Sequence, residues 1–288
     1  MSARAVSIDG VLVDPARATI SVFDRGLLYG DGCFEVLRTW GGVAVELAAH
    51  LDRLYGSLAA LKLRAIERDA LAAAVEQTVA GAGEGEHRIR IIVTRGPGGL
   101  GAETASLGPG AAIVIVEPLG PLAQQLSAAI VDWPVPRRSG PAHKTLAYLD
   151  HVIARDLARA AGADEAIRLD ADGRAVEGAT SSLYAVIGGA VVVPPVVGIL
   201  PGIVRTRVVA VCARESIVMR EAPITLDELR AADEIFASSS LRGVVAVTRL
   251  DGVPRAAGPI TARIASAIAT EMQALGSSAV SGRQRGPG

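Results

Sequence analysis

The chain has 288 residues and a formal net charge of -1; half of its residues are hydrophobic and 20% are charged. This length suits one or two domains, and the composition permits a large buried core. There is no basic or acidic block, which argues against binding to nucleic acid or to a membrane surface. Cys33 and Cys212 have apolar neighbours and give no disulfide framework, and the N-terminus lacks an apolar signal segment. We therefore expect a cytoplasmic protein.

The first half of the chain predicts short strands interleaved with two helices. Five leucines between residues 47 and 61 follow a helical spacing, so a helix is predicted there. Pro and Gly at residues 118–121 interrupt any regular element and favour a linker. The other elements predicted in this half are strands at 5–8, 11–13, 19–22, 34–40, 88–94 and 111–117 and a helix at 69–79.

The second half continues this mixture, so we predict an α+β protein with mixed sheets and two domains. The expected domains are a small N-terminal domain at 1–118, a linker at 119–126 and a larger domain at 127–275. The tail at 276–288 is rich in Gly, Ser and Arg, which predicts disorder. Strands are predicted at 127–132, 165–169, 175–176, 183–187, 190–193, 217–220, 234–237 and 244–249, and helices at 146–160, 202–214 and 261–275.

The stretch from Gly178 to Val204 contains no charged residue and is long enough to suggest a membrane span. Gly188-Gly189 and Pro194-Pro195 interrupt it. The stretch therefore predicts two buried strands joined by a Gly-Gly turn.

Lys144 is unusual because the chain has 27 arginines and only two lysines. A guanidinium stays protonated in proteins, whereas a primary amine can lose its proton and form a Schiff base. A lysine kept at this position therefore indicates chemistry that arginine cannot perform. Taken alone, an ordinary surface lysine is the simpler alternative.

Other segments offer groups that would bind a charged ligand. Glu177 ends a predicted strand, although a surface carboxylate would look the same. Residues 198–205 place a turn directly before a helix, whose free N–H groups favour anions. Arg53 on a predicted helix and the hydroxyls of residues 238–240 add further anion donors. With Lys144, these groups provide what pyridoxal phosphate requires: an amine for its aldehyde, a carboxylate for its ring nitrogen and donors for its phosphate.

In this combination the chain resembles the class IV aminotransferases, the fold-type IV pyridoxal-phosphate enzymes. These include D-amino acid aminotransferase, branched-chain aminotransferase and aminodeoxychorismate lyase. Seven collinear matches leave only the tail uncovered. They are Asp24-Arg-Gly-Leu-Leu-Tyr-Gly-Asp-Gly-Cys-Phe-Glu35, His50-Leu-Asp-Arg-Leu54, Lys144, Gly162-Ala-Asp-Glu-Ala166, Glu177-Gly, Leu200-Pro-Gly-Ile-Val-Arg205 and Ser238-Ser-Ser240.

The resemblance implies a fold-type IV enzyme with a small N-terminal α/β domain and a larger C-terminal domain built on a mixed-sheet pseudo-barrel. It implies pyridoxal 5'-phosphate as cofactor, a homodimer, and an amino acid and a 2-oxo acid as substrates. Lys144 would be the catalytic residue, which carries the cofactor aldehyde and moves a proton between substrate and cofactor. Glu177 would pair with the ring nitrogen, and Leu200 would lie against the ring. The phosphate would be held by Arg53, Ile203, Val204, Ser239 and Ser240.

The chain departs from the family pattern at three positions. Relatives usually have Asn three or four residues after the lysine, where this chain has Ala147, and Asn where Ser182 stands. The whole chain contains no Asn. Val204 stands where many relatives have Thr, so a hydroxyl is lost at the phosphate. None of the core chemical groups is missing.

The substrate stays open at this stage. The loop from Arg95 to Gly101 lacks the Arg-x-His with which the best-known D-amino acid aminotransferases hold the substrate carboxylate. Arg38 and Arg90 remain as carboxylate candidates, with Phe34 and Tyr148 as further substrate-binding candidates. Arg90 and Tyr148 match residues of branched-chain enzymes, while other segments also resemble aminodeoxychorismate lyases. Each arginine could equally be a solvated strand residue.

Three hypotheses follow. The first is a transaminase that exchanges an amino group between an amino acid, either a D-amino acid or a branched-chain L-amino acid, and a 2-oxo acid by a ping-pong mechanism. The second is aminodeoxychorismate lyase, which forms 4-aminobenzoate and pyruvate with the same cofactor. The third is a cofactor-binding protein without turnover. The four histidines show no ligand spacing, so no metal site is expected.

Overall fold

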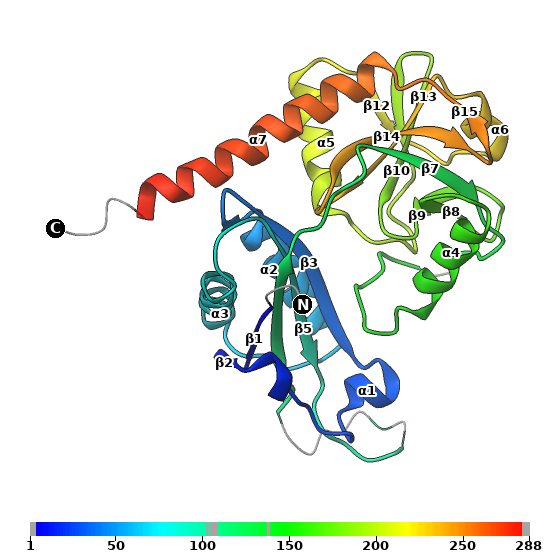
Figure 1. The fold of residues 1–288 in the computed structure, drawn as a ribbon. Coiled ribbons are helices and arrows are strands. Elements are labelled where there is room, and N and C mark those ends of the chain that lie inside the picture. The colour runs from blue at the N-terminus through cyan, green and yellow to red at the C-terminus, as the bar shows by residue number, and fades with distance from the viewer. Residues whose placement is uncertain (1–3, 102, 104–108, 137–138, 284–288) are drawn as a thin grey trace. The chain divides into compact units, whose positions relative to one another are not determined.

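The computed structural model describes residues 4–101, 103, 109–136 and 139–283, and the chain divides into two compact units (Figure 1). The N-terminal unit comprises Met1–Pro121, His143–Tyr148 and Met272–Gly288. The C-terminal unit comprises Leu122–Ala142 and Leu149–Glu271. The division after Pro121 falls within the segment 119–126. The lysine segment His143–Tyr148 belongs to the N-terminal unit, whereas the sequence had placed it in the second domain.

The N-terminal unit is built on a six-stranded sheet in the order β2-β1-β6-β5-β3-β4, in which each neighbouring pair is antiparallel. Along β5, buried residues such as Ile89 and Ile91 alternate with half-buried ones, as expected when one face of a sheet covers a core. The strands are Ala5–Ile8 (β1), Val11–Val13 (β2), Gly32–Trp40 (β3), Val43–Ala44 (β4), His87–Thr94 (β5) and Ala112–Pro118 (β6).

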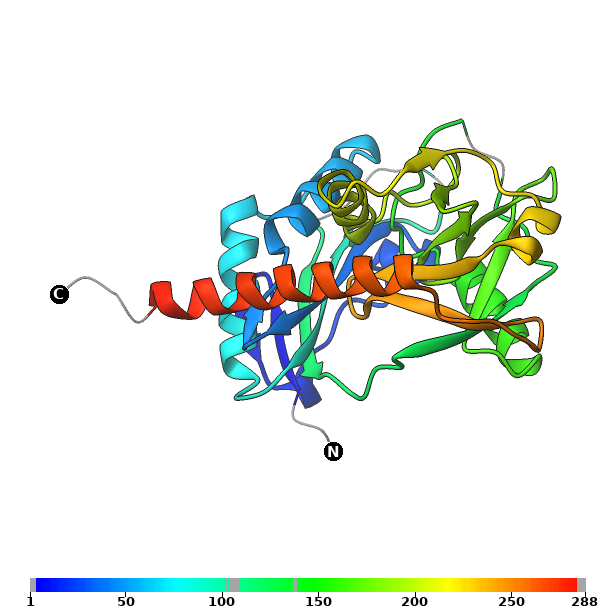
Figure 2. The same cartoon turned by 90° about the horizontal axis from the view of Figure 1, so that it is seen from above.

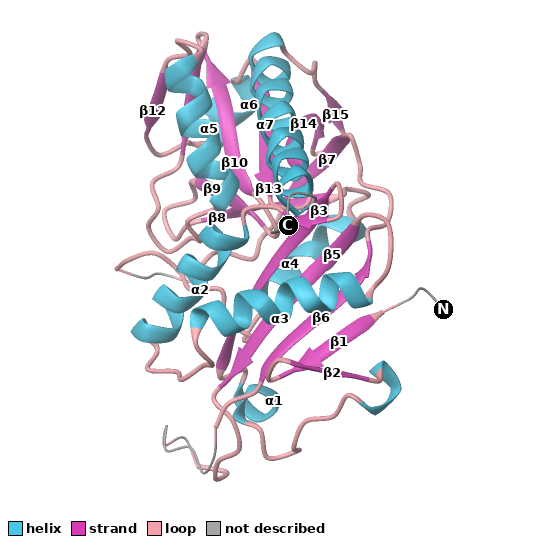
Figure 3. Ribbon diagram, turned by 90° about the vertical axis from the view of Figure 1, so that its left-hand side faces the viewer, coloured by secondary structure: helices cyan, strands magenta, loops and turns pink. Residues whose placement is uncertain are grey.

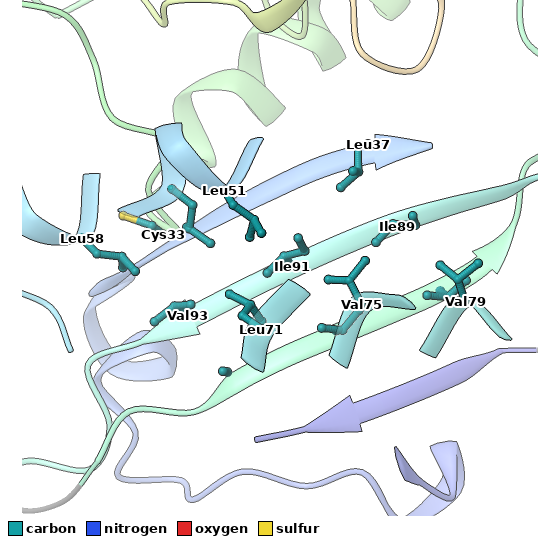
Figure 4. Close-up of a cluster of buried hydrophobic side chains, with 14 of the residues drawn as sticks. Cys33, Leu37, Leu51, Leu58, Leu71, Val75, Val79, Ile89, Ile91 and Val93 are labelled. Atoms are coloured by element: carbon teal, nitrogen blue, oxygen red, sulfur yellow. The ribbon is translucent and has the colours of Figure 1, made fainter. Parts of the chain in front are cut away.

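Two helices, α2 (Leu47–Ala60) and α3 (Arg68–Gly81), cover one face of this sheet (Figure 3). Leu51 of α2 and Leu71 and Val75 of α3 join the strand residues in one buried cluster (Figure 4). Burying each of these side chains contributes about 2 kcal/mol. The packing, more than helix propensity, therefore holds both helices in place. Two shorter helical segments complete the unit, η1 (Pro15–Arg17) and α1 (Arg25–Tyr29).

The C-terminal unit is built on a nine-stranded mixed sheet that closes on itself. The strands run β12-β11-β10-β13-β14-β7-β8-β9, and β9 pairs again with β10 through Glu177 and Ser182, which closes a six-stranded barrel. This is the pseudo-barrel that the resemblance implied. The strands are Gln125–Ile130 (β7), Glu165–Leu169 (β8), Ala175–Gly178 (β9), Ser182–Ile187 (β10), Ala190–Val193 (β11), Met219–Glu221 (β12), Glu234–Ser239 (β13), Gly243–Leu250 (β14) and Val253–Pro254 (β15), which pairs with β14.

The helices of this unit are α4 (Leu149–Ala160), α5 (Ile203–Arg214) and α6 (Leu226–Ala231). The last helix, α7 (Pro259–Arg283), is continuous and contributes residues to both units (Figure 2). The short helix α6 is defined by a capping box, in which Thr225 and Glu228 each satisfy the other's backbone N–H.

The uncharged stretch forms a hairpin, as predicted. Strands β10 and β11 are joined by Gly188 and Gly189, whose φ angles of 58° and 78° favour glycine. In the described part of the chain, no helix is long and apolar enough to cross a membrane.

Several predicted elements differ from the structure. Residues 19–22 form no strand, because Ile20 and Val22 are exposed and no sheet edge receives them. The helix predicted from residue 146 begins at Leu149. Helix α7 continues to Arg283, so the prediction of disorder is wrong for residues 276–283; residues 284–288 lie outside the described part. The short elements α1, β4, α6 and β15 were not predicted because a few residues carry no readable period.

Candidate active site

The lysine segment is held against β3 by backbone hydrogen bonds within the N-terminal unit. The Phe34 N–H donates to the Lys144 carbonyl at 2.9 Å, and the Leu146 N–H donates to the Gly32 carbonyl at 2.9 Å. Cys33 and Thr145 form a β-bridge between the two bonds. The reactive-lysine candidate therefore sits on a backbone fixed by the sheet, and this pairing delays the start of α4 to Leu149.

Glycines of the Gly30-Asp31-Gly32 motif allow this close approach. A Cβ on Gly30 would lie 2.8 Å from the Ala147 nitrogen, and one on Gly32 would lie 2.5 Å from the Val93 carbonyl oxygen and 2.7 Å from Leu146 Cδ1. Gly30 also has φ of 65°, which disfavours other residues. The motif was identified from the sequence, but its physical reason is the chain segment that lies against it.

The side chain of Lys144 lies among aromatic rings. Its Nζ is 4.7 Å from the centroid of Phe34 and 5.1 Å from that of Tyr148. The two rings contact each other edge to face, with centroids 5.1 Å apart and planes at 89°. Three candidates that are distant in sequence are thus brought together around one amine.

Arg90 joins the same cluster. Its guanidinium carbon lies 4.2 Å from the Phe34 ring centroid, so Arg90 and Lys144 contact the same ring. Burial, and secondarily the neighbouring Arg88, lower the pKa of the Arg90 guanidinium. An anion placed beside this side chain would stabilise its charge.

Arg38 contacts residues of β3 and Glu86. Its Nε donates to the Thr39 carbonyl at 2.9 Å, its guanidinium lies 4.5 Å over the Trp40 ring, and Nη2 is 4.0 Å from Glu86. Burial lowers the pKa of Arg38, and Glu86 opposes that effect. Of the two arginines proposed for a substrate carboxylate, Arg90 contacts the same aromatic ring as the lysine.

Arg53 is held by a buried carboxylate. Its Nε and Nη2 donate to the two oxygens of Glu35 at 2.8 Å and 2.6 Å, and His50 Nδ1 lies 2.7 Å from Glu35 Oε2. Burial alone would raise the pKa of the Glu35 carboxyl, but the hydrogen bonds from Arg53 and His50 outweigh it and lower the pKa to about 2. We call these residues the Glu35 cluster. Sequence analysis included Glu35 and His50 only as members of matching motifs and assigned no role to either residue.

Glu177 lies on β9 in the C-terminal unit, directly opposite Arg168 of β8. Arg168 Nη1 is 3.5 Å from Glu177 Oε1, and both side chains are buried. His151 Nδ1 lies 3.4 Å from the same Nη1 and 2.9 Å from the Ala179 carbonyl oxygen. Sequence analysis missed Arg168, because an arginine inside an apolar strand is recognised only when its cross-strand partner is known.

Helix α5 begins at Ile203 with Gly202 as its N-cap, and no side chain caps it. A Cβ on Gly202 would lie 2.6 Å from Ser182 Oγ, so the position is tight. The N–H groups of Ile203 and Val204 are in the first turn, where helices bind anions. Ser182, which replaces the usual Asn, thus lies beside the start of this helix.

The remaining candidates lie at strand and loop ends of the same unit. Ser239 ends β13, and its Oγ accepts a bond from the Arg242 N–H at 3.4 Å. Ser240 follows it and is half-buried, as is Leu200. The neighbouring Ser238 is bonded to Tyr184 at 3.0 Å. Among the described residues, no three or more His, Cys, Asp or Glu side chains form a group that could hold a metal ion.

The chain has the architecture of a fold-type IV pyridoxal-phosphate enzyme. It has two units, the second of which contains a closed barrel with Glu177 at the closing strand pair, and Lys144 is paired with the edge of β3 in the first. The model of the class IV amino-transferase family matches residues 32–250. The chain belongs to this family, and it is a pyridoxal-phosphate-dependent transaminase.

Individual relatives agree with this assignment. A putative branched-chain-amino-acid aminotransferase of Methanocaldococcus jannaschii is 36% identical over 253 residues, covering 86% of this chain and 88% of that protein. A D-alanine aminotransferase of Listeria monocytogenes serotype 4b is 30% identical, with coverage of 90% and 93%. The crystal structure of the branched-chain aminotransferase from Thermoproteus uzoniensis with norvaline is 31% identical, with a TM-score of 0.86 and coverage of 94% and 95%.

The residues present fit pyridoxal 5'-phosphate, the cofactor of this family. A primary amine stands on a fixed backbone at Lys144, and a buried carboxylate stands at Glu177. The start of α5 offers N–H groups beside a glycine, where any side chain would crowd Ser182. These groups match the aldehyde, the ring nitrogen and the phosphate of the cofactor, respectively.

Proposed function

We propose that the enzyme transaminates branched-chain L-amino acids with a 2-oxo acid as the amino acceptor. The observation that carries this proposal is the shared contact of Arg90 and Lys144 with the Phe34 ring. An amino acid substrate needs a cation for its carboxylate close to the amine that carries the chemistry. Arg90 meets this need, since a guanidinium binds a carboxylate with two parallel hydrogen bonds.

The surroundings of Arg90 favour an apolar substrate. The rings of Phe34 and Tyr148 line the lysine, and neither adds a charge that would attract a polar side chain. The relative of Methanocaldococcus jannaschii and the Thermoproteus uzoniensis structure, both named as branched-chain enzymes, support this choice.

The loop after β5 argues against the arrangement described for D-amino acid enzymes. Its arginine, Arg95, donates from Nε to Asp31 at 2.7 Å and from its two terminal nitrogens to the Lys62 and Leu61 carbonyls at 3.0 Å each. This side chain braces the loop. A substrate carboxylate is therefore assigned to Arg90, which lies on β5 itself.

The roles of the other residues form part of the proposal. When bound, the cofactor supplies an electron sink for the electrons released at the substrate carbon. The Nζ of Lys144 would hold its aldehyde and move the proton at the substrate α-carbon. The Glu177 carboxylate would pair with the ring nitrogen, and Leu200 would contact the ring. The phosphate would be bound by the N–H groups of Ile203 and Val204, by Ser239 and Ser240, and by Arg53, which Glu35 orients.

We also propose that the protein is a homodimer. The segment Phe23–Tyr29 exposes Phe23, Leu27 and Tyr29, and Leu100 extends the same surface, because the Tyr29 hydroxyl bonds to the Leu100 carbonyl. Sedimentation of the wild type and of Leu27→Glu checks this: a wild-type monomer would contradict it.

Visible absorbance spectroscopy of the cofactor-loaded enzyme tests the substrate. We expect L-leucine to convert the band of the lysine-bound cofactor to that of its amine form, and D-alanine to leave it unchanged. A response to D-alanine alone would overturn the branched-chain assignment. Formation of 4-aminobenzoate from aminodeoxychorismate, with neither amino acid acting, would select the lyase.

Arg90→Met and Arg38→Met form a matched pair for the carboxylate. We expect Arg90→Met to raise the KM for L-leucine by about 100-fold, equivalent to about 3 kcal/mol of a charge-assisted contact. Arg38→Met should leave KM within about twofold. Equal effects of the two substitutions would remove Arg90 from its role.

A further inference from the structure

His143, the residue directly before Lys144, makes a side-chain contact that has no role in the function described so far. It is half-buried and begins the segment that the chain contributes to the N-terminal unit between residues 143 and 148. Its Nδ1 lies 3.2 Å from the Oγ of Ser57 on α2. Ser57 is 5% exposed. The contact therefore joins the start of the lysine segment to the helix that carries Arg53.

The direction of this hydrogen bond follows from the other partner of Ser57. The Ser57 hydroxyl donates to the Arg53 carbonyl at 3.0 Å, because a carbonyl oxygen can only accept. A hydroxyl has one hydrogen, so its remaining contact must be one that it accepts. Both contacts are made together when His143 Nδ1 carries a proton and donates it to Ser57. Two bonds thus run from His143 through Ser57 to the backbone of Arg53.

Strand β3 contacts the same two regions from the other side. The Phe34 N–H donates to the Lys144 carbonyl at 2.9 Å. The next residue, Glu35, receives Nε and Nη2 of Arg53 at 2.8 Å and 2.6 Å. The contacts therefore form a closed circuit within the N-terminal unit, which runs from β3 through the lysine segment and α2 and back to β3.

Such a circuit matters because Lys144 and Arg53 are proposed to bind the two ends of one molecule, its aldehyde and its phosphate. A ligand that must engage two groups at once binds more tightly when their separation is fixed beforehand. The bonds to β3 hold the lysine segment at Lys144 and at Leu146. The contact of His143 with Ser57 holds it on the preceding side.

We propose that His143 is a positioning residue that, through Ser57, fixes the lysine segment relative to Arg53, so that one cofactor molecule meets the amine and the phosphate donor together. The inference deepens the proposed function, because it rests on the proposed roles of Lys144 and Arg53.

Two forms of the cofactor give the test. Pyridoxal phosphate carries the aldehyde that Lys144 would bind, whereas pyridoxamine phosphate has the same ring and phosphate but cannot bond covalently to an amine. His143→Phe should raise the dissociation constant of pyridoxal phosphate about fivefold, as expected for one lost hydrogen bond, and leave that of pyridoxamine phosphate within about twofold. Equilibrium dialysis of the apoenzyme measures both constants. An unchanged constant for pyridoxal phosphate, or an equal loss for both forms, would overturn the inference.

The acceptor and a conservative variant sharpen this measurement. Ser57→Ala removes the acceptor and should reproduce the effect of His143→Phe, and it serves in its place if His143→Phe does not fold. The double variant should be no weaker than either single variant, because both remove the same bond. His143→Asn, whose amide nitrogen can replace Nδ1 as the donor, should stay close to the wild type. Additive losses, or a loss in His143→Asn as large as in His143→Phe, would contradict the proposal.

Tyr55→Phe is the matched control on the same helix. It removes a hydroxyl that bonds to the Ile66 carbonyl and should leave both dissociation constants at their wild-type values. A change in the ratio of the two constants in Tyr55→Phe would mean that any disturbance of α2 has this effect, and the specific role of His143 would be lost.

The premises are tested separately. Lys144→Ala should weaken the binding of pyridoxal phosphate alone, and Arg53→Met should weaken the binding of both forms. If either variant keeps the wild-type constants, the proposed role of that residue fails. If both behave as expected while His143→Phe keeps the wild-type constants, the inference about His143 fails and the proposed function stands.

Discussion

Each unit of the molecule buries a glutamate beside an arginine, and the two pairs are built differently. In the N-terminal unit, Glu35 receives two bonds from Arg53 at 2.6–2.8 Å and a third contact from His50. In the C-terminal unit, Arg168 approaches Glu177 at 3.5 Å and spends its other nitrogens on backbone carbonyls. Glu35 engages Arg53 with both carboxylate oxygens, whereas Arg168 contacts Glu177 through one terminal nitrogen at a longer distance. Burial of the glutamate alone therefore does not determine how closely its arginine is held.

The largest expected effect is on turnover, and it comes from Lys144, which belongs to neither glutamate–arginine pair. Lys144→Ala should lower turnover by at least about 10⁴-fold, because it removes the amine that we propose carries the cofactor and transfers the proton. The melting temperature of the apoenzyme should change little, because the lysine backbone stays paired with β3. Single-turnover kinetics and thermal unfolding check the two parts. Lys62→Ala is the control, and activity retained in Lys144→Ala would refute the site.

The next effect tests whether the Glu35 cluster is structural. Glu35→Gln removes the buried carboxylate and leaves the charge of the half-buried Arg53 without it, so the free energy of unfolding should fall by roughly 3 kcal/mol. Denaturant titration of the apoenzyme measures it. Glu177→Gln, in which Arg168 keeps its two carbonyl partners, should destabilise the apoenzyme less. An equal loss of unfolding free energy in Glu35→Gln and Glu177→Gln would show that the two pairs contribute alike to stability.

The dependence of stability on pH tests the Glu35–Arg53 pair separately. The pKa of Glu35 falls from 4.5 to about 2 on folding, so the folded state binds this proton more weakly than the unfolded state. Its contribution is therefore complete above about pH 4.5 and is lost as pH falls towards 2, and it amounts to about 3 kcal/mol. Unfolding free energies of wild type and Glu35→Gln should converge over that interval. Parallel curves would show that Glu35 titrates normally.

The smallest expected effect concerns α5, the helix whose start we propose binds the phosphate. Gly202→Ala puts a Cβ 2.6 Å from Ser182 Oγ, and relief of this contact should shift the first turn of α5. We expect the dissociation constant of pyridoxal phosphate to rise about tenfold, equivalent to about 1.4 kcal/mol. Gly202→Ala combined with Ser182→Ala, which removes the crowded hydroxyl, should recover most of the loss. Failure of that rescue would place the strain elsewhere.

Much of the fold was readable because its elements carry clear periods. The leucines of α2, the alternation in β5 and the Gly-Gly turn after β10 each encode local structure that packing then reinforces. The closing pair between Glu177 and Ser182 was not readable, because pairing between strands leaves no local pattern.

For the candidate site too, residue types could be recognised in the sequence, whereas contacts between strands could not. Lys144 and Glu177 could be proposed from the sequence, because few residue types can supply a Schiff-base amine or a carboxylate for a ring nitrogen. The sequence could not show which of Arg38 and Arg90 contacts the ring beside the lysine. The two arginines lie on neighbouring strands, and Arg90 pairs with Val36, two residues before Arg38. Only the Phe34 ring, brought beside Lys144 by β3, separates them. Arg168 escaped notice for the same reason.

In the barrel of the C-terminal unit, the strand pair β9–β10 that closes the barrel is shorter than the neighbouring pair β10–β13. Strands β10 and β13 pair along the whole of Ser182–Val186, whereas β9 meets β10 at Glu177 and Ser182. A joint with so few bonds opens more often than its neighbours, and amide hydrogen exchange reports such openings. A ligand that engages both Glu177 on β9 and the helix start beside Ser182 bridges the two sides of that joint. If the cofactor binds both groups as proposed, it links β9 to β10, and the amides of β9 should exchange more slowly in the loaded enzyme while those of β13 keep their rate.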